Sequence, residues 1–210
     1  AWRQIVSEIG SIKDFRTQRR MRIGGYGLLP TVGQNDSYAP LTSPTDEEAT
    51  FSISKRGGTE TVTLEMMAND DVGAMRRIPL RLGRAAAQTL YRTVFDFIKD
   101  NTALSFTDDT TALFTAGHAN LGTAALNPDS LDAALTRMKI QTAYNTSTEP
   151  LGLVPRFLLH PPDLWRTVDK LVNSKNGEPF TTDNDNNPFL QLKLQPIEIY
   201  YWTDTNNWYL

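Results

Sequence analysis

The sequence predicts an α+β fold, and three patterns along the chain indicate it. A breaker-rich segment with strand-like alternation comes first, a long amphipathic helix follows, and short strands and helices then alternate to the end. With 210 residues, of which 40% are apolar and 21% charged, the chain can form one sizeable core or two small ones.

The composition excludes several classes of site. No cysteine is present, so disulfide bridges and thiolate zinc sites are excluded. No apolar run approaches the roughly 18 residues that a membrane-spanning helix requires. We therefore expect no membrane partner.

The net charge of −3 hides blocks of opposite sign. Residues 1–22 carry six basic and two acidic side chains, and residues 23–71 carry two basic and eight acidic ones. Residues 72–100 return to six basic against two acidic, and the remainder has seven against twelve. Such alternation favours complementary surfaces, although solvated faces of unrelated elements explain the sums equally well.

The first half of the chain predicts an arm followed by a projecting hairpin. Residues 1–22 are polar and basic, and apolar residues three and four apart permit an amphipathic helix over residues 5–15. Gly, Pro and Asn exclude a helix between residues 24 and 44. Alternation then predicts strands at residues 50–54 and 59–66. This part of the chain has few residues suited to a core. The scarcity favours a hairpin that projects and packs on another surface.

A long helix is predicted over residues 78–99, with Pro79 in its first turn. Apolar residues recur along it at helical spacing, and we expect this stripe, which includes Leu82 and Leu90, to be buried. An adjacent stripe is basic and consists of Arg77, Arg81, Arg84 and Arg92.

The second half alternates between strands and helices. Asn127 to Ser130 predicts the cap of a helix over residues 131–143. Pro161 and Pro162 open another helix that reaches about residue 174, and a polar loop is expected at residues 176–188. Short strands are predicted at residues 112–114, 157–160, 190–194, 197–202 and 208–210.

The side chains that carry chemistry in enzymes do not form a recognisable site. His118 and His160 have no carboxylate at metal-ligand spacing. Residues 183–187 begin like a calcium loop, but the required Gly and Glu are missing. Ser52 and Lys55 match a serine acyltransferase pattern but lie on an alternating strand, which turns them to opposite faces. We predict no catalytic residue, no metal and no cofactor.

Strings in a fixed order resemble a known protein family. They are LEMMANDDVGAMRRIP at residues 64–79, LGRAAA at residues 82–87, LFTAGHANLGT at residues 113–123 and RFLLHPP at residues 156–162. This succession resembles major capsid proteins of tailed bacteriophages with the Hong Kong 97 fold, in the Mu-like, prohead-protease-linked group.

The resemblance implies a domain organisation. It implies an N-terminal arm at residues 1–22, an extended β-hairpin loop at 23–54, and a peripheral domain at 55–116 with a spine helix at 78–99. Residues 117–210 would form an axial α/β domain. Family members continue past the position of Leu210, so we expect the fold to be incomplete at its C-terminus.

The resemblance also implies a function and partners. The chain would self-assemble as hexamers and pentamers of an icosahedral shell that encloses phage DNA without sequence-specific binding. Scaffold or prohead protease, portal and decoration proteins are possible further partners. The location would be the virion, and the host cytoplasm before assembly. Three alternatives stay open: an encapsulin-type compartment, a small α/β hydrolase or transferase, and a nucleic-acid-binding module that uses the arginine stripe.

Oppositely charged surfaces predict a contact between subunits. In the resembling fold, the extended loop of one subunit lies over the peripheral domain of its neighbour. We therefore expect the acidic side chains of the loop to meet the arginine stripe of a neighbouring helix. The residues concerned are Asp36, Asp46, Glu47 and Glu48 on the loop, and Arg77, Arg81, Arg84 and Arg92 on the helix.

Overall fold

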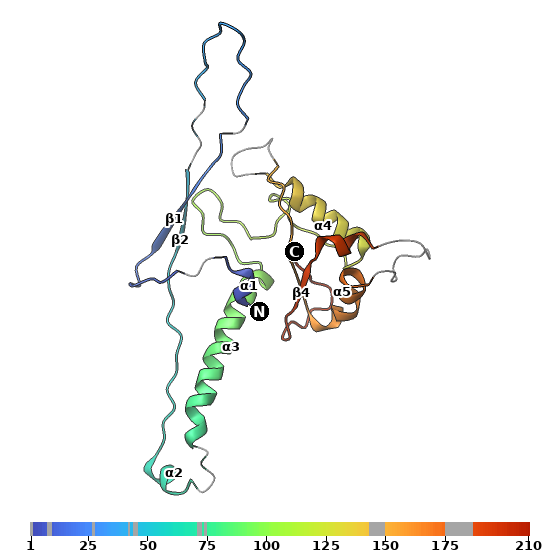
Figure 1. The fold of residues 1–210 in the computed structure, drawn as a ribbon. Coiled ribbons are helices and arrows are strands. Elements are labelled where there is room, and N and C mark those ends of the chain that lie inside the picture. Colours follow the sequence, from blue (N-terminus) through green and yellow to red (C-terminus); the bar gives the residue numbers. More distant parts are fainter. Residues whose placement is uncertain are drawn as a thin grey trace. The chain divides into compact units, whose positions relative to one another are not determined.

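The computed structural model has an α+β fold that divides into two compact units (Figure 1). It describes residues 2–7, 10–26, 28–41, 43, 46–70, 73, 75–142, 150–174 and 187–210. Unit 1 comprises Met21–Glu47 and Phe114–Leu210, and unit 2 comprises Trp2–Arg20 and Glu48–Leu113.

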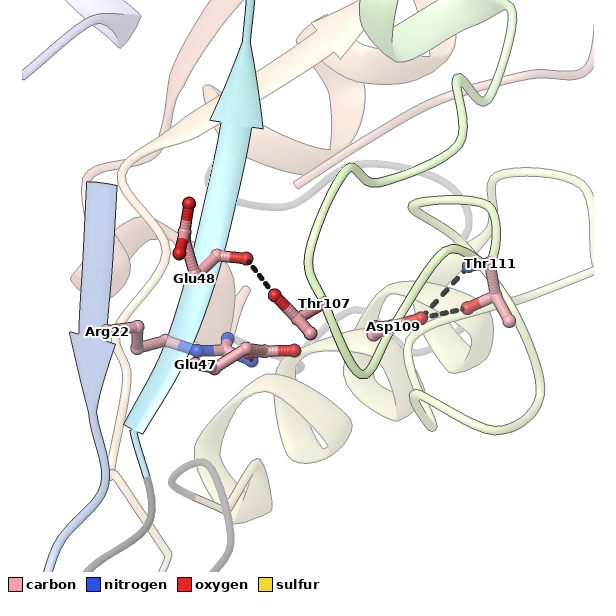
Figure 2. Close-up of polar contacts among 6 residues, drawn as sticks. All are labelled: Arg22, Glu47, Glu48, Thr107, Asp109 and Thr111. Atoms are coloured by element: carbon pink, nitrogen blue, oxygen red, sulfur yellow. Dashed lines mark hydrogen bonds and ion pairs between the residues drawn. The ribbon is translucent and has the colours of Figure 1, made fainter. Parts of the chain in front are cut away.

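A two-stranded ladder forms where the N-terminal segment meets the acidic block. Strand β1 (Gln18–Ile23) pairs with β2 (Asp46–Phe51), and Figure 2 shows them running in opposite directions. The chain between them, residues 24–45, is the extended loop, and Figure 1 draws it as a long excursion from this ladder. A hairpin is present, but not the predicted one: the sequence predicted strands at residues 50–54 and 59–66, whereas the observed pair is β1 and β2.

Two expectations for the first half were wrong. The predicted helix at residues 5–15 is a single turn, α1 (Trp2–Ile5), and residues 10–17 are not helical. Residues 52–63 belong to no helix or strand. Alternation alone does not make a strand, because a strand needs a hydrogen-bonding partner, and no described residue pairs with this segment. Helix α2 (Leu64–Ala68) follows, because Thr63 caps it by accepting from the Met66 N–H at 3.3 Å.

The long helix α3 (Ile78–Lys99) has the predicted bounds and follows the 3₁₀ turn η1 (Met75–Arg77). Pro79 lies in its first turn, where the missing N–H costs no helical hydrogen bond. Phe95 is fully buried and its ring lies 4.8 Å from that of Tyr91. The expected burial of the whole stripe was wrong: Leu82 is 46% exposed and Leu90 is 49% exposed. Most of α3 is solvent-exposed, so the described residues leave this face largely uncovered.

The main hydrophobic core lies in unit 1. Helix α4 (Pro128–Ile140) begins at a capping box in which Asn127 and Ser130 each accept from the other's backbone N–H. Strand β3 (Phe157–His160) leads through η2 (Pro162–Leu164) into α5 (Trp165–Val172). Strand β4 (Gln195–Glu198) then pairs with β3 in parallel. The core residues are Leu126, Leu131, Leu135, Leu158, Val168, Leu171, Val172, Phe189 and Leu194.

The helices predicted for this half are confirmed, but its strands only in part: residues 197–198 lie in β4, and Ala112 and Tyr209 form isolated bridges in place of the strands predicted at 112–114 and 208–210. The helix after Asn127, the strand at residues 157–160 and the helix after Pro162 are all present. The predicted strand at residues 190–194 is instead the 3₁₀ helix η3 (Pro188–Leu192). Asn187 explains the difference, because its side chain accepts from Phe189 N–H at 2.9 Å and starts the helix. The predicted loop at residues 176–188 lies mostly outside the described residues.

Candidate functional site

The ladder at the root of the extended loop brings a basic strand against an acidic one. Strand β1 contributes Arg19, Arg20 and Arg22, and β2 begins with three consecutive acids. The guanidinium of Arg19 lies 3.1 Å from the Glu48 carboxylate. Arg22 makes a second ion pair, with Glu47, and Figure 2 shows its side chain reaching from β1 towards β2.

The two ion pairs differ in burial. Arg19 is largely exposed and Glu48 is partly so, which makes this a surface pair of small energetic value. The Glu47 side chain is 0% exposed, whereas its partner Arg22 is 44% exposed. One carboxylate oxygen of Glu47 meets Arg22, and the other has no hydrogen-bond partner among the described residues. Glu47 is therefore a buried charge held by a single arginine.

A short hairpin at residues 102–113 supports the other edge of β2. Its two sides pair through backbone hydrogen bonds, and Asp109 closes its turn by accepting from the Thr111 hydroxyl at 2.6 Å. The hydroxyl of Thr107 donates to the Glu48 carbonyl at 3.1 Å (Figure 2), and its backbone N–H donates to the same oxygen at 2.9 Å. Thr50 N–H donates to the Ser105 carbonyl at 2.9 Å. Strand β2 is thus held on both edges.

The extended loop itself exposes apolar side chains. Leu28 is 77% exposed and Tyr38 is 87% exposed, and Tyr26, Leu29 and Leu41 are also exposed. The acidic side chain of Asp36 on the loop is exposed, and so is that of Asp46, the first residue of β2. Large exposed apolar residues gathered on one segment are typical of an interaction surface.

The exposed face of α3 has the complementary character. Arg77, Arg81, Arg84 and Arg92 are exposed, and so are Leu80, Leu82 and Leu90 on the same helix. The helix therefore exposes leucines and a stripe of positive charge, whereas the extended loop exposes leucines and tyrosines together with the acidic Asp36.

Comparison with protein families identifies the chain. A family model described as phage capsid protein matches residues 46–210, which is well over half of the sequence and begins at the first residue of β2. The chain belongs to the phage capsid protein family. Comparison with curated proteins and with solved structures found no match.

This membership gives the function in outline. The protein is a major capsid protein, a structural subunit that assembles with copies of itself into the shell of the phage head. It is therefore a component of the virion. The family match does not favour the encapsulin-type compartment or the small hydrolase or transferase.

The eight charged residues predicted from the sequence fall into two groups in the capsid protein. Glu47 and Glu48 are paired within the chain, with Arg22 and Arg19. Asp36 and Asp46 are exposed, and so are Arg77 at the start of α3 and Arg81, Arg84 and Arg92 within it. The contact between subunits stays a prediction.

Sequence reasoning missed the roles of Arg19, Arg22 and Thr107. The signal for the arginines was present, because a basic block directly precedes an acidic block along the chain. The sequence interpretation assigned the acidic partners to another subunit, whereas the ladder joins the two blocks within one chain. Thr107 had no signal, since its role depends on a backbone carbonyl of β2.

The remaining features of the described structure concern metals, membranes, histidines and hollows. Its described residues contain no group of three or more metal-ligating side chains, and none of its described helices is long and apolar enough to cross a membrane. His160 is buried, and its Nδ1 lies 2.9 Å from the Pro161 carbonyl, as expected of a structural histidine. A shallow hollow between α5 and β4 is lined by His160, Asp169 and Glu198 among others.

Proposed function

We propose that this capsid protein has the Hong Kong 97 fold, in the Mu-like, prohead-protease-linked group, and that its extended loop docks on helix α3 of a neighbouring subunit. In this proposal, residues 1–22 are the arm, residues 23–54 the loop region, residues 55–116 the peripheral domain and residues 117–210 the axial domain. Subunits gather in hexamers and pentamers. Before assembly the protein is located in the host cytoplasm, where it binds a scaffold or prohead protease, portal and decoration proteins.

The observation that carries the proposal is a pair of surfaces that match each other. The loop exposes leucines and tyrosines with acidic neighbours, and α3 exposes leucines with arginine neighbours. No basic residue occurs between residues 23 and 54. Since a capsid subunit meets many copies of itself, a second copy is the natural partner for both surfaces.

The energetics assign different roles to the two kinds of contact. Burial of exposed leucines supplies affinity, at about 25 cal/mol for each Å² of apolar surface removed from water. Exposed ion pairs contribute only about 0–1 kcal/mol each, so they set the alignment of the loop and the rate of docking. Permanent interfaces of this kind bury more than roughly 2,000 Å² in total.

Light scattering and negative-stain electron microscopy of the purified protein test the proposal. We expect closed shells or ring-shaped capsomers. A species that stays monomeric at high concentration and at several salt concentrations would overturn it. Particles isolated from infected cells should contain DNA. A cargo compartment of the same fold would contain protein instead, so the contents distinguish the two functions.

A further inference from the structure

The charges in the root of the loop do not by themselves select one alignment of the two strands. Strand β1 carries three arginines within four residues, and β2 begins with Asp46, Glu47 and Glu48 in succession. Sliding one strand along the other still brings opposite charges together. The exposed pair of Arg19 and Glu48 discriminates weakly between such alignments, because water screens it in each of them.

Glu47 differs from its two acidic neighbours because it is buried. Asp46 is exposed and Glu48 is partly exposed, so both are in contact with water in the observed alignment. The Glu47 carboxylate is removed from water and has Arg22 as its ion-pair partner. A one-residue slip of β1 would turn Arg22 to the opposite face and leave the buried Glu47 charge without this partner, which is strongly unfavourable.

The half-satisfied state of Glu47 argues against a mainly stabilising role. One of its oxygens is buried and has no hydrogen-bond partner among the described residues. A buried ion pair in this state is a poor source of stability compared with an apolar pair of similar volume. Its clearest effect is on specificity, since it disfavours the one-residue slip of β1 that the exposed charges permit.

We propose that Glu47 is a positioning residue, which acts through Arg22 to fix the register of β1 on β2 and hence the direction in which the extended loop leaves the ladder. A slip of one residue turns every side chain of a strand to the opposite face, so register and loop direction change together. The importance of this for assembly rests on the proposed docking of the loop on α3. The register itself is a property of the single subunit.

The test measures register in unassembled, dilute subunits. The protein has no cysteine, so Tyr26→Cys and Ser43→Cys place two unique spin labels on the two arms of the loop, just outside the ladder. Electron paramagnetic resonance then gives the distribution of distances between them. We expect one narrow distribution for this parent. In Glu47→Gln the distribution should widen about twofold or more, because alternate registers become accessible.

Two further variants separate positioning from stability. Glu48→Gln is the matched control, since it removes a neighbouring charge from a surface pair, and its distribution should stay narrow. Arg22→Met with Glu47→Leu replaces the ion pair by an apolar pair. We expect this variant to melt at or above the temperature of the parent and still to show the widened distribution.

The outcomes are distinct. A narrow distribution in Arg22→Met with Glu47→Leu overturns the proposal, even where Glu47→Gln fails to fold. Equal widening in Glu48→Gln also overturns it, because any loss of charge would then have the same effect. Failure of the parent to form shells would contradict the proposed function and leave the register measurement unchanged.

Discussion

Leu82 and Leu90 lie on the apolar stripe of α3, and about half of each side chain is exposed. Helical spacing predicted that they share a face, and they do. The spacing cannot tell whether the same chain covers that face. Leu158 lies on a short strand and is fully buried, because α5 and its neighbours close over β3.

This contrast gives a prediction for single side chains. Replacing both leucines, Leu82→Ser with Leu90→Ser, should change the unfolding free energy of the subunit by less than about 1 kcal/mol, since surface substitutions are usually mild. Assembly into shells should be lost. Denaturant unfolding and electron microscopy measure the two effects. Leu158→Ala is the control and should cost about 2–5 kcal/mol.

The two ion pairs of the ladder give a second prediction at this scale. Arg22→Ala should lower the unfolding free energy by about 2–3 kcal/mol, because it leaves Glu47 buried and unpaired. The value is below that of a fully buried pair, since 44% of the Arg22 side chain is exposed. Arg19→Ala should cost about 0–1 kcal/mol. Equal costs in chemical denaturation would contradict the difference in burial.

The sequence predicted best the helices and strands whose position is set by residues close by in the chain. Pro79 lies in the first turn of α3, which begins where predicted, and the Asn127 capping box starts α4, which begins three residues earlier than the predicted residue 131. Residues 52–63 alternate like a strand yet pair with no described residue, because pairing depends on chain elsewhere. Strand β1 was missed for the same reason, since its arginines needed the acids of β2.

The extended loop is the element with the clearest experimental consequence. Deleting residues 30–43 and joining the ends with a short Gly-Ser turn leaves both strands of the ladder intact. The melting temperature should barely change, because the described residues of the deleted segment are exposed and none of them belongs to the core. Shells should not form. A large drop in melting temperature by calorimetry would show that the loop packs within its own subunit.

For the molecule as a whole, the sequence predicted the class and the family better than the candidate site. The α+β class and the phage capsid family are confirmed. The charge blocks indicated complementary surfaces, but two of the four predicted loop acids, Glu47 and Glu48, bind arginines of their own chain. Net charge along a sequence cannot distinguish a partner within the chain from one in a copy, because both satisfy the same Coulomb attraction.

Assembly between copies gives the prediction at this scale. Arg77→Glu with Arg84→Glu should block shell formation and leave the melting temperature of the subunit unchanged, since both side chains are exposed. Adding Asp36→Arg with Asp46→Arg should restore assembly, because both acids lie outside the described ion pairs of the ladder. Sedimentation and microscopy provide the measurement. Normal assembly of the double arginine variant at low and moderate salt would exclude this contact.

The extended loop and α3 are two different surfaces of the subunit, and this has a consequence for the symmetry of the assembly. A contact between two unlike surfaces is heterologous, so it cannot be completed within a two-fold pair of subunits. Each added subunit covers the exposed α3 of one neighbour with its loop and adds an exposed α3 of its own. At the opposite end of the row, one extended loop also stays without a partner. The chain of contacts ends only when the last subunit meets the first. Incomplete arcs therefore always expose apolar surface, which favours closed capsomers over partial ones.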